Sequence, residues 1–106
     1  MDLTLDDVTN EFCWNINWSG MTGPATAMHF HGPALPGAGA GIRVNVGMIS
    51  GLASPSVGCT TVTSAFATEI MDDLWYLNIH STAFPGGEIR GQTANLPVDL
   101  MSFEID

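Results

Sequence analysis

The most informative stretch of this chain is Ala25-Thr26-Ala27-Met28-His29-Phe30-His31. Successive side chains on a β-strand point to opposite faces, so Met28 and Phe30 share one face while His29 and His31 share the other. An apolar face opposite a more polar one is typical of a half-buried strand. We therefore predict a strand over residues 25–31 that packs through Met28 and Phe30 and presents both histidines on its other side.

The same kind of alternation along the chain predicts about eight short strands joined by Gly-rich and Pro-rich turns. Besides residues 25–31, strands are expected at residues 3–5, 12–18, 42–46, 59–66, 74–80, 88–92 and 98–105. Residues 68–73 are expected to form one helical turn. Strands without alternating helices predict an all-β fold, a Greek-key antiparallel sandwich or barrel. A length of 106 residues fits one domain over residues 1–106.

The chain is strongly acidic. Eleven Asp and Glu residues accompany two arginines and no lysine, which gives a net charge of −9 at pH 7. With so few cations to neutralise phosphates, this balance argues against nucleic acids and anionic membrane surfaces as partners. No apolar run approaches the ~18 residues of a membrane-spanning helix. The composition gives no indication of the oligomeric state.

The two cysteines, Cys13 and Cys59, have the spacing of neither a zinc knuckle nor a redox motif. An even count in a small β-rich domain favours one disulfide and an oxidising compartment, and the alternative is two reduced thiols in the cytosol. Residues 1–7 are acidic and carry no signal-peptide pattern. We expect a secreted, periplasmic or cell-surface protein whose signal is absent from this sequence.

All three histidines fall in β-patterned runs: His29 and His31 in the first stretch, and His80 at the end of YLNIH at residues 76–80. Two histidines on one strand face lie ~6.5 Å apart between Cα atoms, so both imidazoles can reach one ion. Imidazole suits copper, zinc, iron and nickel. The sequence thus predicts a metal site formed by His29, His31 and His80. The alternative is three polar residues on a solvated strand face.

Two long motifs resemble the signatures of the chordin-type (CHRD) domain. They are MTGPATAMHFHGPA at residues 21–34 and LWYLNIHSTAFPGGEIRGQ at residues 74–92. The resemblance covers residues 3–92 and leaves residues 93–106 as a C-terminal extension. It implies a secreted or cell-surface protein. Because animal relatives bind extracellular signalling factors, it also implies an extracellular binding or structural module.

A more distant resemblance is to the copper/zinc superoxide dismutases, which are immunoglobulin-like Greek-key β-barrels. That family has a His-x-His pair, a later His, and then an Arg in a Gly-rich stretch. His29 and His31, then His80, then Arg90 follow in that order here. The resemblance implies a copper site at which Arg90 attracts superoxide. Because the chain has no fourth His to bridge a second ion, no zinc subsite is expected.

These patterns lead to one main prediction, a metal-dependent superoxide dismutase with a three-histidine redox site. The site would hold copper or, as its main rival, iron. Zinc with three histidines and a water would instead indicate hydrolysis. Two non-catalytic functions stay open: an extracellular binding or structural CHRD module, and a copper-holding protein without turnover. Arg43 is expected to be structural, with lining of the metal site as its alternative. Arg90 has the alternative of a surface ion pair with Glu88 or a loop acid. Glu88 either supports a ligand His or is solvated.

Overall fold

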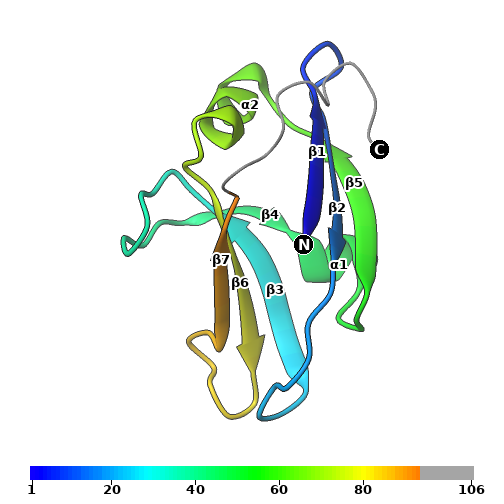
Figure 1. Ribbon diagram of the computed structural model, residues 1–106, viewed down its shortest axis with the longest axis vertical. Coiled ribbons are helices and arrows are strands. Elements are labelled where there is room, and N and C mark those ends of the chain that lie inside the picture. The colour runs from blue at the N-terminus through cyan, green and yellow to red at the C-terminus, as the bar shows by residue number, and fades with distance from the viewer. Residues whose placement is uncertain (94–106) are drawn as a thin grey trace.

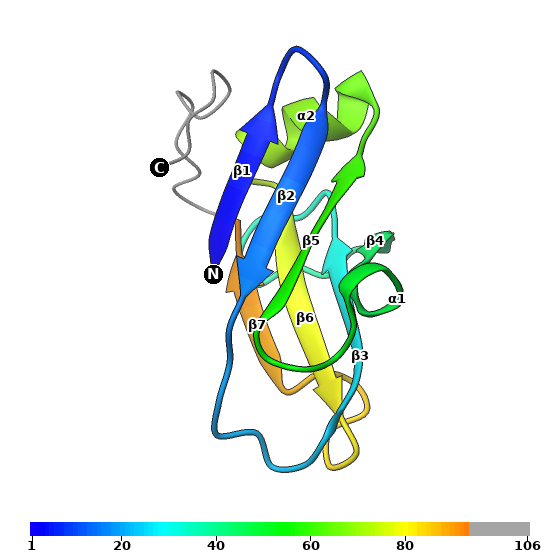
Figure 2. The same ribbon diagram turned by 90° about the vertical axis from the view of Figure 1, so that its right-hand side faces the viewer.

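The computed structural model describes residues 1–93 and places them in two antiparallel sheets packed face to face. The three-stranded sheet has the order β1-β2-β5, formed by β1 (Asp2–Asp6), β2 (Glu11–Ile16) and β5 (Ser56–Thr61). The four-stranded sheet has the order β4-β3-β6-β7, formed by β4 (Ile42–Asn45), β3 (Ala25–His31), β6 (Tyr76–Ser81) and β7 (Ile89–Gln92). Figure 2 shows the first sheet in front of the second. The predicted all-β sandwich is confirmed, and its Greek-key path stays a prediction.

An aromatic cluster fills the space between the two sheets. Phe12 and Trp14 come from β2, Phe30 comes from β3, and Trp75 directly precedes β6; none of the four is more than 2% exposed. The Phe12 ring lies 5.0 Å from Phe30 and 5.7 Å from Trp75, both edge to face. Burying each such side chain contributes roughly 1.5–3 kcal/mol to folding. This core fixes which face of β3 points inward.

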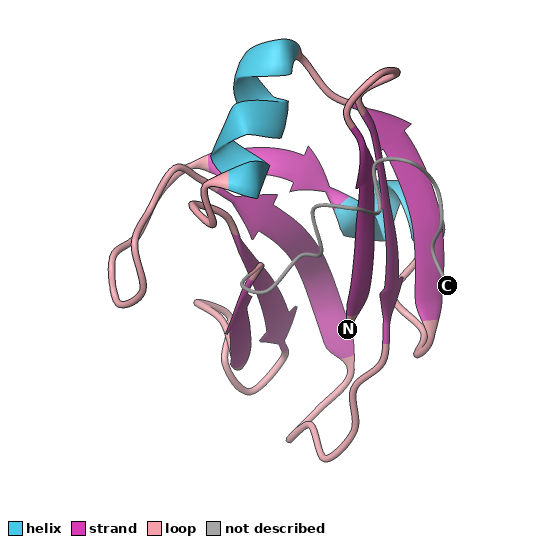
Figure 3. Cartoon of the chain, turned by 45° about the horizontal axis from the view of Figure 1, so that its top comes forward, coloured by secondary structure: helices cyan, strands magenta, loops and turns pink. Residues whose placement is uncertain are grey.

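Two short helices depart from the expected single turn at residues 68–73. The first, α1 (Val46–Ser50), joins β4 to β5 and is the shorter of the two helices in Figure 3. It begins where the Asn45 side chain accepts a hydrogen bond from the Met48 amide. The second, α2 (Ser64–Met71), covers one end of the sandwich in Figure 1. The strand expected over residues 59–66 is therefore wrong beyond Thr61. The physical reason is that the Thr63 hydroxyl caps a helix by accepting from the Phe66 amide.

The two cysteines form a disulfide within the three-stranded sheet. Cys13 on β2 is the direct cross-strand partner of Cys59 on β5, with the Cα atoms 4.0 Å apart. The predicted disulfide is thus confirmed. It lies in the three-stranded sheet, which carries no histidine. The disulfide and the three histidines therefore belong to different sheets.

Two further expectations concern membrane spans and the C-terminal strand. No helix within residues 1–93 is long and apolar enough to cross a membrane. The strand expected at residues 98–105 lies outside the described residues.

Candidate metal centre

The three histidines lie on the outer face of the four-stranded sheet. His29 and His31 are on β3, and His80 is on the neighbouring strand β6. In the antiparallel register His80 is opposite Ala27, two positions before His29. Phe30, which stands between the two histidines on β3, is fully buried on the other face. Strand pairing therefore gathers at one place the histidines of two distant motifs.

The imidazoles converge closely enough to be considered as one ligand set. One ring nitrogen from each of His29, His31 and His80 lies within 4.8 Å of those of the other two. The ring centroid of His29 is 5.5 Å from that of His31 and 5.3 Å from that of His80. Imidazole nitrogens bind copper- or zinc-sized ions at ~2.0–2.1 Å. Small side-chain rotations would therefore bring all three nitrogens to one ion.

One nitrogen of each ring is buried without a hydrogen-bond partner: His29 Nδ1, His31 Nε2 and His80 Nε2. A polar atom removed from water without a partner is costly, roughly 1–3 kcal/mol. Histidines on a solvated strand face would instead direct these atoms to water. Three unpartnered nitrogens in one ligand set fit a bound cation.

The second nitrogens of two of these rings have backbone partners. His31 Nδ1 is 3.0 Å from the Ala40 carbonyl oxygen, and His80 Nδ1 is 2.8 Å from the Pro85 carbonyl oxygen. A carbonyl oxygen only accepts, so each Nδ1 must carry the proton. In the neutral ring this leaves the lone pair on Nε2, the unpartnered atom. Such carbonyl partners are typical of metal-ligating histidines, whose tautomer and orientation they fix.

The surroundings of His29 affect the charge of its imidazole. Burial is the main cause that lowers the pKa of His29, and the neighbouring His80 and then His31 lower it further. A lowered pKa keeps the His29 imidazole neutral at physiological pH. Only the neutral ring offers a lone pair to a metal ion.

Arg90 lies on the same face as the histidines but not directly beside them. Its guanidinium carbon is 3.6 Å from the centre of the Tyr76 ring, and Nη2 donates weakly to the Leu35 carbonyl oxygen at 3.5 Å. The Tyr76 ring in turn stacks on His31 at 4.9 Å between centroids. The surface ion pair with Glu88 does not form in the described residues, where the one salt bridge is Arg43–Glu69. The role of Arg90 in attracting an anion stays a prediction.

Glu88 stays accessible to solvent and also connects two segments of the chain. Its two carboxylate oxygens accept hydrogen bonds from the Thr22 amide at 2.7 Å, the Thr22 hydroxyl at 3.0 Å and the Ser81 hydroxyl at 2.6 Å. The bond from Ser81 is the largest cause that lowers the pKa of Glu88. Glu88 therefore joins the β2–β3 connection to the end of β6, and no ligand histidine is among its partners in the described chain.

Gly87 explains part of the Gly-rich stretch before Arg90 on structural grounds. It adopts a φ of +124°, a conformation that L side chains rarely adopt. A Cβ at this position would collide with the amide of Asn78, which lies opposite both His29 and Arg90 on β6. Glycine is thus needed here for the close approach of this turn to the outer face.

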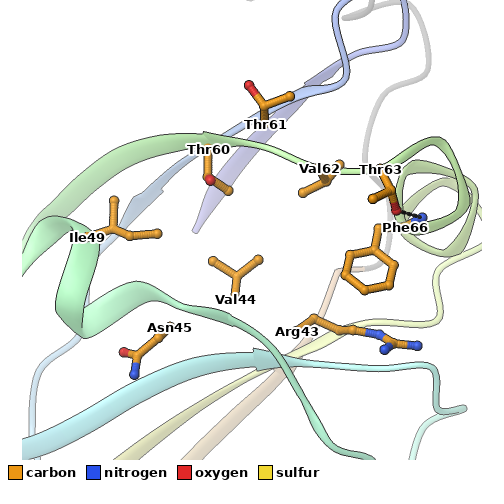
Figure 4. Close-up of a pocket in the computed structure, with 9 residues that line it drawn as sticks. All are labelled: Arg43, Val44, Asn45, Ile49, Thr60, Thr61, Val62, Thr63 and Phe66. Atoms are coloured by element: carbon orange, nitrogen blue, oxygen red, sulfur yellow. Dashed lines mark hydrogen bonds between the residues drawn. The ribbon is translucent and has the colours of Figure 1, made fainter.

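A groove of about 270 Å³ lies between the edge strands β4 and β5, and no histidine is among the residues that line it (Figure 4). Its lining mixes apolar side chains with threonines and two other polar residues: Arg43, Val44, Asn45, Ile49, Thr60, Thr61, Val62, Thr63 and Phe66. Arg43 is neutralised there, since Nη2 is 3.0 Å from Glu69 Oε2 and the guanidinium lies 4.3 Å above the Phe66 ring. These contacts agree with a structural role for Arg43, which stays a prediction.

Sequence reasoning missed three components of this face. Ala40 and Pro85 act through their carbonyl groups, and no side-chain pattern indicates which loop carbonyl reaches a histidine. Tyr76 did carry a signal, because alternation places it on the same strand face as His80. Its contact with His31 depends on the register that pairs these two residues across β3 and β6.

Comparison with known proteins yields one finding. The family model of the CHRD domain matches residues 1–93, the whole of the described chain. No match appears among curated proteins or solved structures. The more distant resemblance to copper/zinc superoxide dismutases therefore gains no support from relatives. Since the matched region covers most of the chain and includes both signature motifs, this protein belongs to the CHRD domain family.

Proposed function

We propose that this CHRD domain is an extracellular metal-binding module that holds one ion through His29, His31 and His80. One observation carries the proposal: a nitrogen of each imidazole is buried without a partner, and these histidines form one potential ligand set. The carbonyl partners of His31 and His80 supply the second layer that metal-binding histidines need. The disulfide agrees with a secreted, periplasmic or cell-surface location.

Copper is the ion that this donor set favours. All three donors are imidazoles, and no carboxylate belongs to the group, which argues against the facial triad of iron(II). Divalent copper also binds nitrogen donors more tightly than zinc or iron. All histidines of the chain are used by this one ion, so the proposal includes no zinc subsite.

Metal titration of chelator-treated protein tests the proposal. We expect one Cu(II) per chain, with nitrogen hyperfine lines in its electron paramagnetic resonance spectrum, and weaker binding of Zn(II) and Fe(II) measured by chelator competition. His31→Ala should lose most of the affinity. Glu11→Gln is the matched control, because Glu11 lies beside the disulfide and far from the histidines in the other sheet. Equal copper binding by wild type and His31→Ala would contradict the proposal and favour a purely structural or protein-binding module.

A second candidate function, superoxide dismutation, is favoured by the position of Arg90. Arg43 is paired with Glu69, which leaves Arg90 as the one described arginine without a carboxylate partner. It is held over Tyr76, the neighbour of His31. In a chain of net charge −9, a local cation is needed to draw superoxide toward the histidines. Bound copper would supply the electron exchange by cycling between two oxidation states.

Superoxide consumption by the copper-loaded protein, compared with free copper and with chelated protein, tests this candidate. Arg90→Ala should lower the rate while the copper content stays unchanged, and the remaining rate should depend differently on ionic strength. Arg90→Lys should retain part of the effect, since long-range attraction needs charge more than fork geometry. If neither copper-loaded nor iron-loaded protein exceeds the free ion, the domain holds metal without turnover.

A further inference from the structure

Tyr76 is the central ring of three side chains stacked across the outer face. The His31 imidazole lies 4.9 Å from it between centroids, with an angle of 5° between the planes. The Arg90 guanidinium carbon is 3.6 Å from its centre. Because β6 lies between β3 and β7 in the sheet, the histidine and the arginine approach this ring from neighbouring strands on either side. Tyr76 is the only tyrosine of the chain and is 5% exposed.

A second connection joins Tyr76 to His31 through one backbone residue. The Ala40 amide donates to the Tyr76 hydroxyl at 3.1 Å, and the Ala40 carbonyl accepts from His31 Nδ1 at 3.0 Å. Ala40 lies in the loop between β3 and β4. This loop is held to the end of β3 by the Gly32 amide, which donates to the Gly41 carbonyl at 3.1 Å. The tyrosine therefore holds the residue that fixes the tautomer of the histidine.

We propose that Tyr76 is a positioning residue of the metal centre, which holds the His31 imidazole so that its Nε2 points toward His29 and His80. The inference rests on the metal-binding function proposed above. Ordinary packing would require only an apolar ring. Here the flat face is parallel to the imidazole and the hydroxyl binds the backbone partner of that imidazole. Loss of such a supporting partner weakens metal binding ~10–100-fold in known sites.

Two substitutions separate the ring from the hydroxyl. Tyr76→Phe keeps the stack and loses the bond to Ala40, so Cu(II) affinity in chelator competition should fall only a few-fold. Tyr76→Leu loses both, so affinity should fall ~10–100-fold, and the nitrogen hyperfine pattern of bound Cu(II) should change. Phe66→Leu is the matched control, because it also removes a ring beneath an arginine but contacts no histidine in the described structure. Wild-type affinity and an unchanged spectrum in Tyr76→Leu would overturn the inference.

A measurement on metal-free protein distinguishes failure of this inference from failure of the proposed function. In wild type, nitrogen-15 spectra should show His31 in the single tautomer protonated at Nδ1, and the Ala40 amide should exchange slowly. Tyr76→Phe should speed exchange at Ala40 but not at Gly32, and Tyr76→Leu should mix the His31 tautomers. If wild type binds no copper, the proposed function fails while these spectra still test the hold on His31. Unchanged exchange and tautomer in both variants would overturn the positioning role, whatever the metal result.

Discussion

The two faces of the seven-residue strand β3 carry side chains of opposite kinds, apolar on one face and polar on the other. Met28 and Phe30 point inward and are 0% exposed. Phe30 packs against the aromatic rings of Phe12, Trp14 and Trp75. Such apolar contacts require close packing but no hydrogen-bond partner. His29 and His31 point outward, half-buried, and each has a buried nitrogen that finds no partner.

The buried groups on the two faces differ in what they contribute to the stability of the fold. On the inner face, each buried group is apolar and gains from burial. On the outer face, three buried polar atoms gain nothing from folding, and each costs free energy while it is unpartnered. Folding alone therefore accounts for the inner face but not for the outer one. Substitutions on the two faces should then act on different measurements.

The largest effect on stability is expected from Phe30→Ala. Truncating a buried phenylalanine removes apolar contact and leaves a cavity, at a cost of about 3–5 kcal/mol in the free energy of unfolding. Urea denaturation of metal-free protein measures this loss, and Phe30→Leu should lose clearly less. A loss under about 1 kcal/mol would place Phe30 outside the core that the comparison assigns to it.

The disulfide comes next. The Cys13→Ala/Cys59→Ala double variant removes a constraint on the unfolded chain, because the two cysteines are 46 residues apart in the sequence. The chain-entropy relation predicts a destabilisation of about 4 kcal/mol. Copper affinity of the folded variant should equal that of wild type, because the cysteines belong to the other sheet. A clear loss of copper affinity at a temperature where the variant is folded would show that the two sheets are coupled.

His29→Ala should have the opposite effect: little loss of stability and a large loss of copper affinity. The free energy of unfolding of metal-free protein should fall by no more than about 1 kcal/mol, because the removed nitrogen has no partner to lose. Copper affinity should fall by more than the ~10–100-fold typical of a lost supporting group. Met28→Ala, one residue away on the inner face, is the matched control: it should lose about 2–5 kcal/mol and keep its copper affinity when folded. Two variants with the same profile would abolish the distinction between the faces.

The sequence allowed some of these features to be predicted and not others. Alternation alone placed β3 at Ala25–His31 and put His29, His31 and His80 on outward faces. Helix α1 was missed because Val46 and Gly47 favour strand and turn, and the deciding contact is a single Asn45 cap. The support of the site was missed for a related reason. Carbonyl groups of Ala40 and Pro85 reach the histidines only after the loops have folded over the sheet.

The smallest expected effect is at Glu88, which connects Thr22 in the β2–β3 connection to Ser81 at the end of β6. The hydrogen bond from Ser81 is the largest cause that lowers the pKa of Glu88 from its ordinary value of 4.5, and those from Thr22 add to it. A carboxyl group whose pKa is lower in the folded state stabilises the fold above its ordinary pKa. This contribution is lost as the pH falls through the lowered value.

Glu88→Gln should therefore reduce the dependence of the melting temperature on pH below 4.5, with little change at pH 7 in copper affinity. The amide nitrogen of glutamine cannot accept, so the variant keeps only one accepting oxygen for Thr22 and Ser81. Asp7→Asn is the matched control, since the Asp7 side chain is exposed and accepts no hydrogen bond within residues 1–93. The measurement is a series of thermal unfolding curves between pH 3 and pH 7 for the three proteins, without metal. If Glu88→Gln and Asp7→Asn alter the slope equally, Glu88 contributes only its charge, and its hydrogen bonds with Thr22 and Ser81 add nothing to the stability of the fold.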